Sequence, residues 1–141
     1  MHSPLVLTGK NRASRMAIHR RVDVQAVWRW SAVILWMGVI FVLSATPKIA
    51  TPLEPLYDFT FKKVAHVTVY AILTVLLFRA LQIHITDKGR ALVTAALVAV
   101  LYAFSDEWHQ TFVPGREGTL RDVAIDAIGA VGMSMWLRIK P

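Results

Sequence analysis

The sequence contains no cysteine and few charged residues. Without cysteine, disulfide bonds and thiol catalysis are excluded, and the redox compartment stays undetermined. Only 18% of the 141 residues are charged whereas 55% are hydrophobic, a balance too apolar for a typical soluble domain. The sequence also lacks a serine–histidine–aspartate nucleophile order, a phosphate-binding glycine loop, a zinc-binding signature and internal repeats. Its information must therefore lie in its apolar segments and in the charges beside them.

Four long apolar segments dominate the chain, at residues 30–46, 64–78, 91–105 and 123–137. Each is poor in charge and too long for an ordinary buried strand, so each is expected to be a membrane-spanning helix. We therefore predict an all-α integral membrane bundle of four transmembrane helices. It forms one domain at residues 28–141, preceded by a basic tail at residues 1–27. Three prolines predict a loop over residues 46–63.

The net charge of +7 is distributed unevenly along the chain. Eleven of the 16 basic residues precede the first segment, lie between the second and third, or follow the fourth. In a four-span topology these stretches share one side of the membrane. Because lysine and arginine are enriched on the cytoplasmic side, both termini are predicted to be cytoplasmic. The same distribution indicates contact of the tail with anionic membrane lipids and argues against a nucleic-acid partner.

In three of the segments, the helix between the two flanking charged residues is shorter than the hydrocarbon layer of a bilayer is thick. Fifteen residues separate Lys63 from Arg79, Arg90 from Asp106, and Asp122 from Arg138. At 1.5 Å per residue they cover roughly 22 Å of a hydrocarbon layer about 30 Å thick. Arginine reaches the interface with its long stem, but aspartate is too short to do so. We therefore predict that the outer ends of the last three helices enclose a polar recess that opens outwards.

Helical spacing assigns further residues to this recess. The faces that it predicts carry Lys63, His66 and Tyr70 on the second helix, Tyr102, Asp106 and His109 on the third, and Asp122, Asp126 and Gly129 on the fourth. Gly129 and Gly132 are expected to let the fourth helix approach its neighbours closely.

Four stretches carry most of these residues: FVLSATP at 41–47, KKVAHVTVY at 62–70, YAFSDEWHQTFVPGR at 102–116 and RDVAIDAIGAVG at 121–132. From about residue 30 onwards, their order resembles the VanZ-like family of small bacterial membrane proteins. The residues that match the family pattern are Lys63, His66, Tyr70, Asp106, Glu107, His109, Gln110, Phe112, Pro114, Gly115, Arg116, Asp122, Val123, Gly129 and Gly132. Asp126 departs from it, because relatives often carry asparagine there.

The resemblance implies a multi-pass protein of the bacterial inner membrane with a role in the cell envelope. The family is named for a protein linked to low-level resistance to the glycopeptide teicoplanin. The resemblance implies no reaction, cofactor or metal, and leaves open whether the protein is an enzyme.

Two sets of candidate site residues follow from the residues and the resemblance. The candidate catalytic residues are Asp106, Glu107 and His109, and the candidate ligand-binding residues are Lys63, His66, Tyr70, Gln110, Arg116, Asp122 and Asp126. Asp106 and His109, three residues apart on a helix, suit a metal site in a bundle. Asp122, Asp126 and His66 could complete it as an oxygen-rich site for a divalent cation. The alternative is a lattice of salt bridges that fastens three helices together.

The preferred hypothesis is a site that binds or processes an anionic, lipid-linked envelope molecule, such as a cell-wall intermediate or a phospholipid. Arg116 and Lys63 would hold the anionic group, while Gln110 and Tyr70 would orient it. In an enzyme, Asp106 or Glu107 paired with His109 would serve as general base or metal ligand in phosphoryl or acyl transfer. The alternatives are a non-catalytic binder and a structural or proton-coupled partner of a larger envelope complex. Protein partners are not identified by the sequence.

Overall fold

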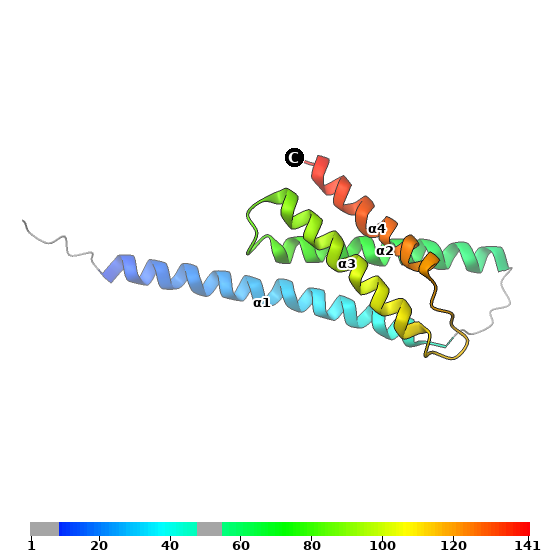
Figure 1. Cartoon of the computed structure of the whole chain (residues 1–141). Coiled ribbons are helices and arrows are strands. Elements are labelled where there is room, and N and C mark those ends of the chain that lie inside the picture. Colours follow the sequence, from blue (N-terminus) through cyan, green and yellow to red (C-terminus); the bar gives the residue numbers. More distant parts are fainter. Residues whose placement is uncertain (1–8, 48–54) are drawn as a thin grey trace, which may run out of the picture.

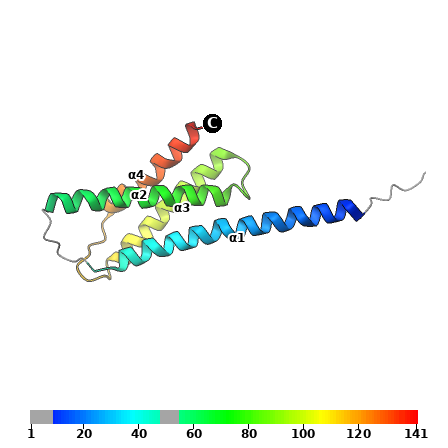
Figure 2. The same cartoon turned by 180° about the vertical axis from the view of Figure 1, so that it is seen from behind.

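The computed structural model describes residues 9–47 and 55–141, and the side chains of residues 24–47 and 62–141. Four helices follow one another along the chain: α1 (Gly9–Ala45), α2 (Pro55–Leu81), α3 (Lys88–Gln110) and α4 (Leu120–Ile139). The described residues contain no strand, which confirms the all-α prediction. Helices α2, α3 and α4 pack on one another, and the N-terminal half of α1 extends beyond them (Figures 1 and 2).

Three of the helices are long and apolar enough to cross a membrane, namely α1 over Val24–Ala45, α2 over Lys62–Leu81, and α3. This confirms a multi-pass membrane protein in its broad outline. Helix α4 has 20 residues but carries four charges, at Arg121, Asp122, Asp126 and Arg138. Its role as a fourth span and the cytoplasmic position of the termini therefore stay predictions.

The loop predicted over residues 46–63 is wrong in its second part, because α2 begins at Pro55. Proline at the first helical position removes only an N–H that would have no partner there, and its fixed φ already suits a helix. Pro52 lies outside the described residues. Helix α1 begins at Gly9, so the stretch predicted as a basic tail is helical from that residue onwards.

Helix α3 packs through a stripe of alanines. Ala91, Ala95, Ala99 and Ala103 recur every four residues, and none of them is exposed. Residues four apart lie on one face of a helix, and their small side chains let neighbouring backbones approach. One further step of four reaches Glu107, which is only 3% exposed. The alanine stripe thus directs a carboxylate into the interior of the bundle.

Helices α2 and α4 are in backbone contact at Gly129. A Cβ added to Gly129 would overlap the carbonyl oxygen of Val67 on α2. The expected close approach is thus confirmed at this glycine. A Cβ on Gly132 would meet open space, so the same expectation is wrong for Gly132.

Helix α1 is attached to the bundle by hydrogen bonds to backbone carbonyls. The indole Nε1 of Trp36 donates to Val69 O at 2.9 Å, and the hydroxyl of Tyr102 donates to Met37 O at 2.7 Å. The opposite face of α1 exposes large apolar side chains, among them Ile34, Leu35 and Val42. An apolar outer face with polar links turned inwards is what a lipid-facing helix requires.

The two ends of the bundle differ in charge, because one of them carries the basic residues Arg79, Lys88, Arg90, Arg138 and Lys140. The end of α2, the start of α3 and the end of α4 lie near one another (Figure 1), and there Lys88 Nζ donates to Lys140 O at 2.6 Å. The other end contains the last turn of α3, the connection after it and the start of α4. Thr119 caps α4 by accepting from Asp122 N at 3.2 Å, as the N-cap residue of a helix does.

Candidate functional site

Most of the candidate site residues lie together where the ends of α1 and α3 meet the N-terminal parts of α2 and α4. We call six of them the polar cluster: His66, Tyr70, Asp106, Glu107, Gln110 and Asp126. All except His66 are at most 4% exposed. Burial of charged side chains is unfavourable unless other groups compensate for it, so the partners of each side chain decide what the cluster does.

Asp106 and Gln110 form the side of the polar cluster that faces α1. Asp106 Oδ2 accepts hydrogen bonds from Ser44 Oγ of α1 at 2.7 Å and from Gln110 Nε2 at 3.1 Å. Gln110 Nε2 also donates to Glu107 Oε1 at 3.1 Å. The other oxygen of Asp106, Oδ1, is buried without a hydrogen-bond partner. The side-chain amide of Gln110 therefore links two buried carboxylates, and Oδ1 of Asp106 can still accept a hydrogen bond.

Glu107 faces the opposite way, towards α4. Its Oε2 accepts from Thr119 N at 2.9 Å, at the residue that caps α4. The chain comes this close because residue 118 is glycine: a Cβ there would overlap the carbonyl oxygen of Glu107. The hydrogen bond from the connection after α3 thus holds the Glu107 side chain between α3 and α4.

His66 and Asp126 join α2 to α4. His66 Nδ1 lies 3.0 Å from Asp126 Oδ1, and the Asp126 side chain is 0% exposed whereas that of His66 is 25% exposed. Asp126 Oδ2 has no hydrogen-bond partner. One turn nearer the helix starts, Lys63 forms an ion pair with Asp122. One ion pair and one histidine–aspartate contact thus join α2 and α4, two of the three helices that the predicted lattice of salt bridges would fasten.

His109 and Arg116 contact α1. The ring of His109 stacks on Phe41 with 4.3 Å between centroids, and its Nε2 is buried without a partner. Arg116 donates to the carbonyls of Thr46 and Leu43, both at 2.8 Å, and to Gln110 Oε1 at 3.2 Å. The carbonyls at a helix C-terminus lack partners within the helix, so Arg116 caps α1. A role of Arg116 in holding an anion stays a prediction.

Ser44, Gly118 and Thr119 shape the site but were not predicted as site residues. An isolated serine or a loop glycine carries no signal of its own, because each acquires a role only from the helix opposite. The orientation of Glu107, in contrast, could have been found in the sequence. The four-residue alanine repeat that ends at Ala103 continues to Glu107 and marks it as buried.

In the described part of the chain, the group with metal-binding potential contains His66 and Asp126 of the predicted set but not Asp106 and His109, which contact α1. It consists of His66, Glu107 and Asp126, each offering one ligand atom, and these atoms lie within 4.8 Å of one another. They come from α2, α3 and α4, so only the folded bundle brings them together.

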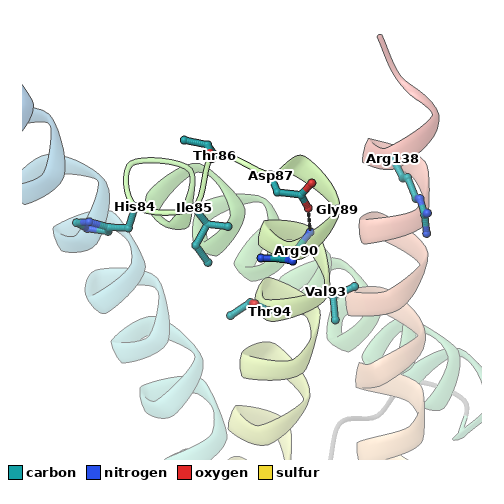
Figure 3. A pocket seen from close by; sticks show the side chains of 9 residues that line it. All are labelled: His84, Ile85, Thr86, Asp87, Gly89, Arg90, Val93, Thr94 and Arg138. Atoms are coloured by element: carbon teal, nitrogen blue, oxygen red, sulfur yellow. Dashed lines mark hydrogen bonds between the residues drawn. The ribbon is translucent and has the colours of Figure 1, made fainter.

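A separate cavity of about 750 Å³ lies at the opposite end of the bundle (Figure 3). Its lining includes Arg90, Asp87 and His84, and the dashed bond in Figure 3 joins Asp87 to the backbone of Arg90. Among the side chains that the structure describes, the buried polar atoms without a partner belong to Tyr70, Asp106, His109 and Asp126, none of which lines this cavity. Buried polar atoms without partners point to a ligand more strongly than the volume of an open groove does, so the polar cluster is the better candidate site.

Comparison with known families agrees with the polar motifs. A family model described as VanZ/LLP1 matches residues 28–140. The chain belongs to this family. No curated protein and no solved structure matches the chain. For this VanZ/LLP1 member the match covers α2, α3, α4 and the apolar part of α1, and with them every residue of the polar cluster.

Proposed function

We propose that this VanZ/LLP1 protein lies in the bacterial inner membrane with four spans, and that its polar cluster binds an anionic, lipid-linked envelope molecule from the outer side. A phospholipid or a lipid-linked cell-wall intermediate has this chemistry, and a change in teicoplanin susceptibility would be the corresponding phenotype. The observation that carries the proposal is the set of buried polar atoms without partners, of which the Tyr70 hydroxyl and, in one tautomer, His109 Nε2 can donate to an anion.

Groups that recognise a polar head lie inside the cluster and at its margin. The hydroxyl of Tyr70 is a buried donor without an acceptor, and Tyr70 lies one helical turn after His66 on the same face of α2. Lys63, 23% exposed in its side chain, lies near the start of the same face of α2. Lysine at a membrane interface attracts anionic headgroups.

Apolar side chains around the cluster support an occupant with lipid tails. Trp108 and Phe112 are 69% and 70% exposed and contact each other edge to face, with ring centroids 5.9 Å apart. Val64 on α2 and Phe104 on α3 are also exposed. Aromatic side chains favour the level of the headgroups, while exposed aliphatic faces accommodate acyl or prenyl chains.

The geometry favours binding over catalysis. Glu107 is held against the start of α4, whereas Asp106 and His109 make their contacts with α1. The three candidate catalytic residues are thus divided between two sides of α3. Catalysis by this trio stays a prediction, and it requires that an incubated lipid be converted and that Asp106→Asn stop the conversion.

Orientation is tested by labelling single cysteines, since the chain has none of its own. A cysteine at Glu117, which is exposed after α3, is expected to react in intact cells with a maleimide that does not cross membranes. A cysteine at Lys140 is expected to react only after the cells are opened, because Lys140 lies at the end of the bundle that is rich in lysine and arginine, which should be cytoplasmic. Labelling of Lys140→Cys but not Glu117→Cys in intact cells would contradict the outward-facing site.

Ligand binding is tested with purified protein in nanodiscs. A polyprenyl phosphate and phosphatidylglycerol are the anionic probes, and phosphatidylcholine is the neutral comparison. Saturable binding of at least one anionic probe is expected. Tyr70→Phe removes only the unpartnered hydroxyl, and it should weaken this binding about tenfold because a hydrogen bond to a charged group contributes about 1.5–3 kcal/mol.

Tyr102→Phe is the matched control for this experiment. It also removes a tyrosine hydroxyl, but that hydroxyl donates to Met37 O and fastens α1. Tyr102→Phe should therefore lower thermal stability and leave probe affinity within about twofold. Equal losses of affinity in both variants, or wild-type binding that does not distinguish anionic from neutral lipid, would rule out the proposed head-group site.

A further inference from the structure

Three side chains in the interior of the bundle present metal-binding atoms to one another. His66 of α2, Glu107 of α3 and Asp126 of α4 offer ligand atoms that lie within 4.8 Å of each other. Atoms bound to Zn²⁺ lie about 2.0–2.2 Å from the ion, hence about 3.4 Å apart in a tetrahedral arrangement. A small side-chain rotation would therefore close the trio around one ion.

One oxygen of the trio is free to bind a further group. Asp126 is 0% exposed, and its Oδ2 has no hydrogen-bond partner. The hydroxyl of Tyr70, equally buried and also without a partner, belongs to the residue one helical turn after His66 on the same face of α2. Buried polar atoms in folded proteins nearly always have a partner. Two such atoms without one, Asp126 Oδ2 and the Tyr70 hydroxyl, therefore indicate that a bound group is missing from the cluster.

Glu107 is already oriented as a metal ligand would be. Its two oxygens accept hydrogen bonds from Gln110 Nε2 and from Thr119 N. Each carboxylate oxygen has a further lone pair, so these bonds orient the group without using up its capacity. Hydrogen bonds of this kind hold metal ligands in place in known sites.

The local charge balance also calls for a cation. Asp106, Glu107 and Asp126 are three buried carboxylates. The bonds to Asp106 and Glu107 come from a serine, an amide and a backbone N–H, all neutral, and Asp126 contacts a histidine. Buried negative charge without compensation is strongly unfavourable, and a divalent ion supplies the largest local compensation available.

We infer that His66, Glu107 and Asp126 form a binding site for a divalent first-row transition-metal ion. One imidazole and two carboxylates suit Zn²⁺ or Mn²⁺, whereas Mg²⁺ and Ca²⁺ prefer oxygen donors alone. The side chain of His66, 25% exposed, provides the route of entry. Three protein ligands leave at least one coordination position for another molecule.

The site stands on its own contacts, but its purpose rests on the proposed function. An acidic cluster repels an anionic head, whereas a cation held by three ligands with an open position attracts a phosphate oxygen. The ion would thus convert the polar cluster from an acidic site into one that binds anions. This role predicts that anionic lipid binds more tightly after the metal has been added.

The test uses the full-length protein, purified in detergent and stripped with EDTA. Titration calorimetry with Zn²⁺ and with Mn²⁺ is expected to give one site per chain for at least one of the two ions. Asp126→Asn and Glu107→Gln keep the shape of each side chain and should weaken that site at least tenfold. The Mn²⁺-loaded protein should show nitrogen coupling in its electron paramagnetic resonance spectrum, lost in His66→Gln.

Glu117→Gln is the matched control, because it makes the same change at an exposed acid near the same end. It should bind the metal as the wild type does. Absence of wild-type binding, or unchanged affinity in both Asp126→Asn and Glu107→Gln, overturns the metal site. A variant that fails to fold, judged by size-exclusion chromatography, is set aside in favour of the other.

Failure of the metal site and failure of the proposed function give different results. Metal binding in the EDTA-stripped protein without any preference for anionic lipid would leave the metal site standing and remove the lipid proposal. Saturable binding of anionic lipid in the continued presence of EDTA, together with no metal binding, would remove the metal site alone. Binding of both, with lipid affinity raised at least about fivefold by the metal, is the expected result.

Discussion

Gly129→Leu is expected to separate α2 from α4 and to destabilise the bundle by about 3 kcal/mol or more, at the upper end for overpacked interfaces. The first atom of any side chain at this position would overlap the carbonyl oxygen of Val67. Backbone cannot rotate away as a side chain can, so the two helices must move apart. The loss of packing then includes the contact between His66 and Asp126, which bridges the same two helices.

Gly132→Leu is the matched control, with the same substitution three residues further along the same helix. Open space surrounds this position, so leucine should fit and should raise helix stability slightly, because glycine is unfavourable within a helix by about 0.5–1 kcal/mol. The measurement is the Tm in detergent, which should fall by about 10 °C or more for Gly129→Leu. Equal Tm values for the two variants would contradict the backbone contact.

His66→Leu is expected to destabilise the protein by about 3–5 kcal/mol, since it removes the partner of a fully buried carboxylate. Asp126 would then keep a fully buried carboxyl group whose described partner is gone. The double variant His66→Leu/Asp126→Leu should recover much of the lost stability, because neither side chain then leaves a buried polar group without a partner. We expect a coupling energy of about 2–3 kcal/mol from the double-mutant cycle.

Stability for this cycle is measured by denaturant unfolding in detergent with EDTA present, so that no bound cation contributes. His84→Leu, at an exposed histidine after α2, is the control and should change stability by less than about 0.5 kcal/mol. Additive effects of His66→Leu and Asp126→Leu would show that the two side chains do not stabilise each other. The contact between His66 and Asp126 would then contribute nothing to the free energy of unfolding.

Much of the fold followed from periodicity and local chemistry. The long apolar segments predicted the four helices. In the structure Thr119 caps α4, because its side chain accepts from Asp122 N. The start of α2 was missed because proline reads as a helix breaker, although it is well tolerated in the first turn. The described part of the chain thus kept its predicted helices, with boundaries shifted by residues whose effect depends on position.

The members of the candidate site were predicted, but their pairing was not. Spacing placed Asp106 and His109 on one face of α3, and both make their contacts with α1. Arg116, expected at an anion, caps the C-terminus of α1 instead. Each of these partners lies 62 to 73 residues away in the chain or on another helix, so no local pattern could identify it.

By itself the sequence determined the membrane character, the helices and the residue types gathered at one end of the bundle, because hydropathy and helical period are properties of short segments. Only the tertiary structure decided that Glu107 turns to α4, that His66 pairs with Asp126, and that these three side chains can share one ion. The rotation of each helix about its axis decides such contacts. That rotation is set by packing, at the alanine stripe of α3 and at Gly129, and not by the polar residues themselves.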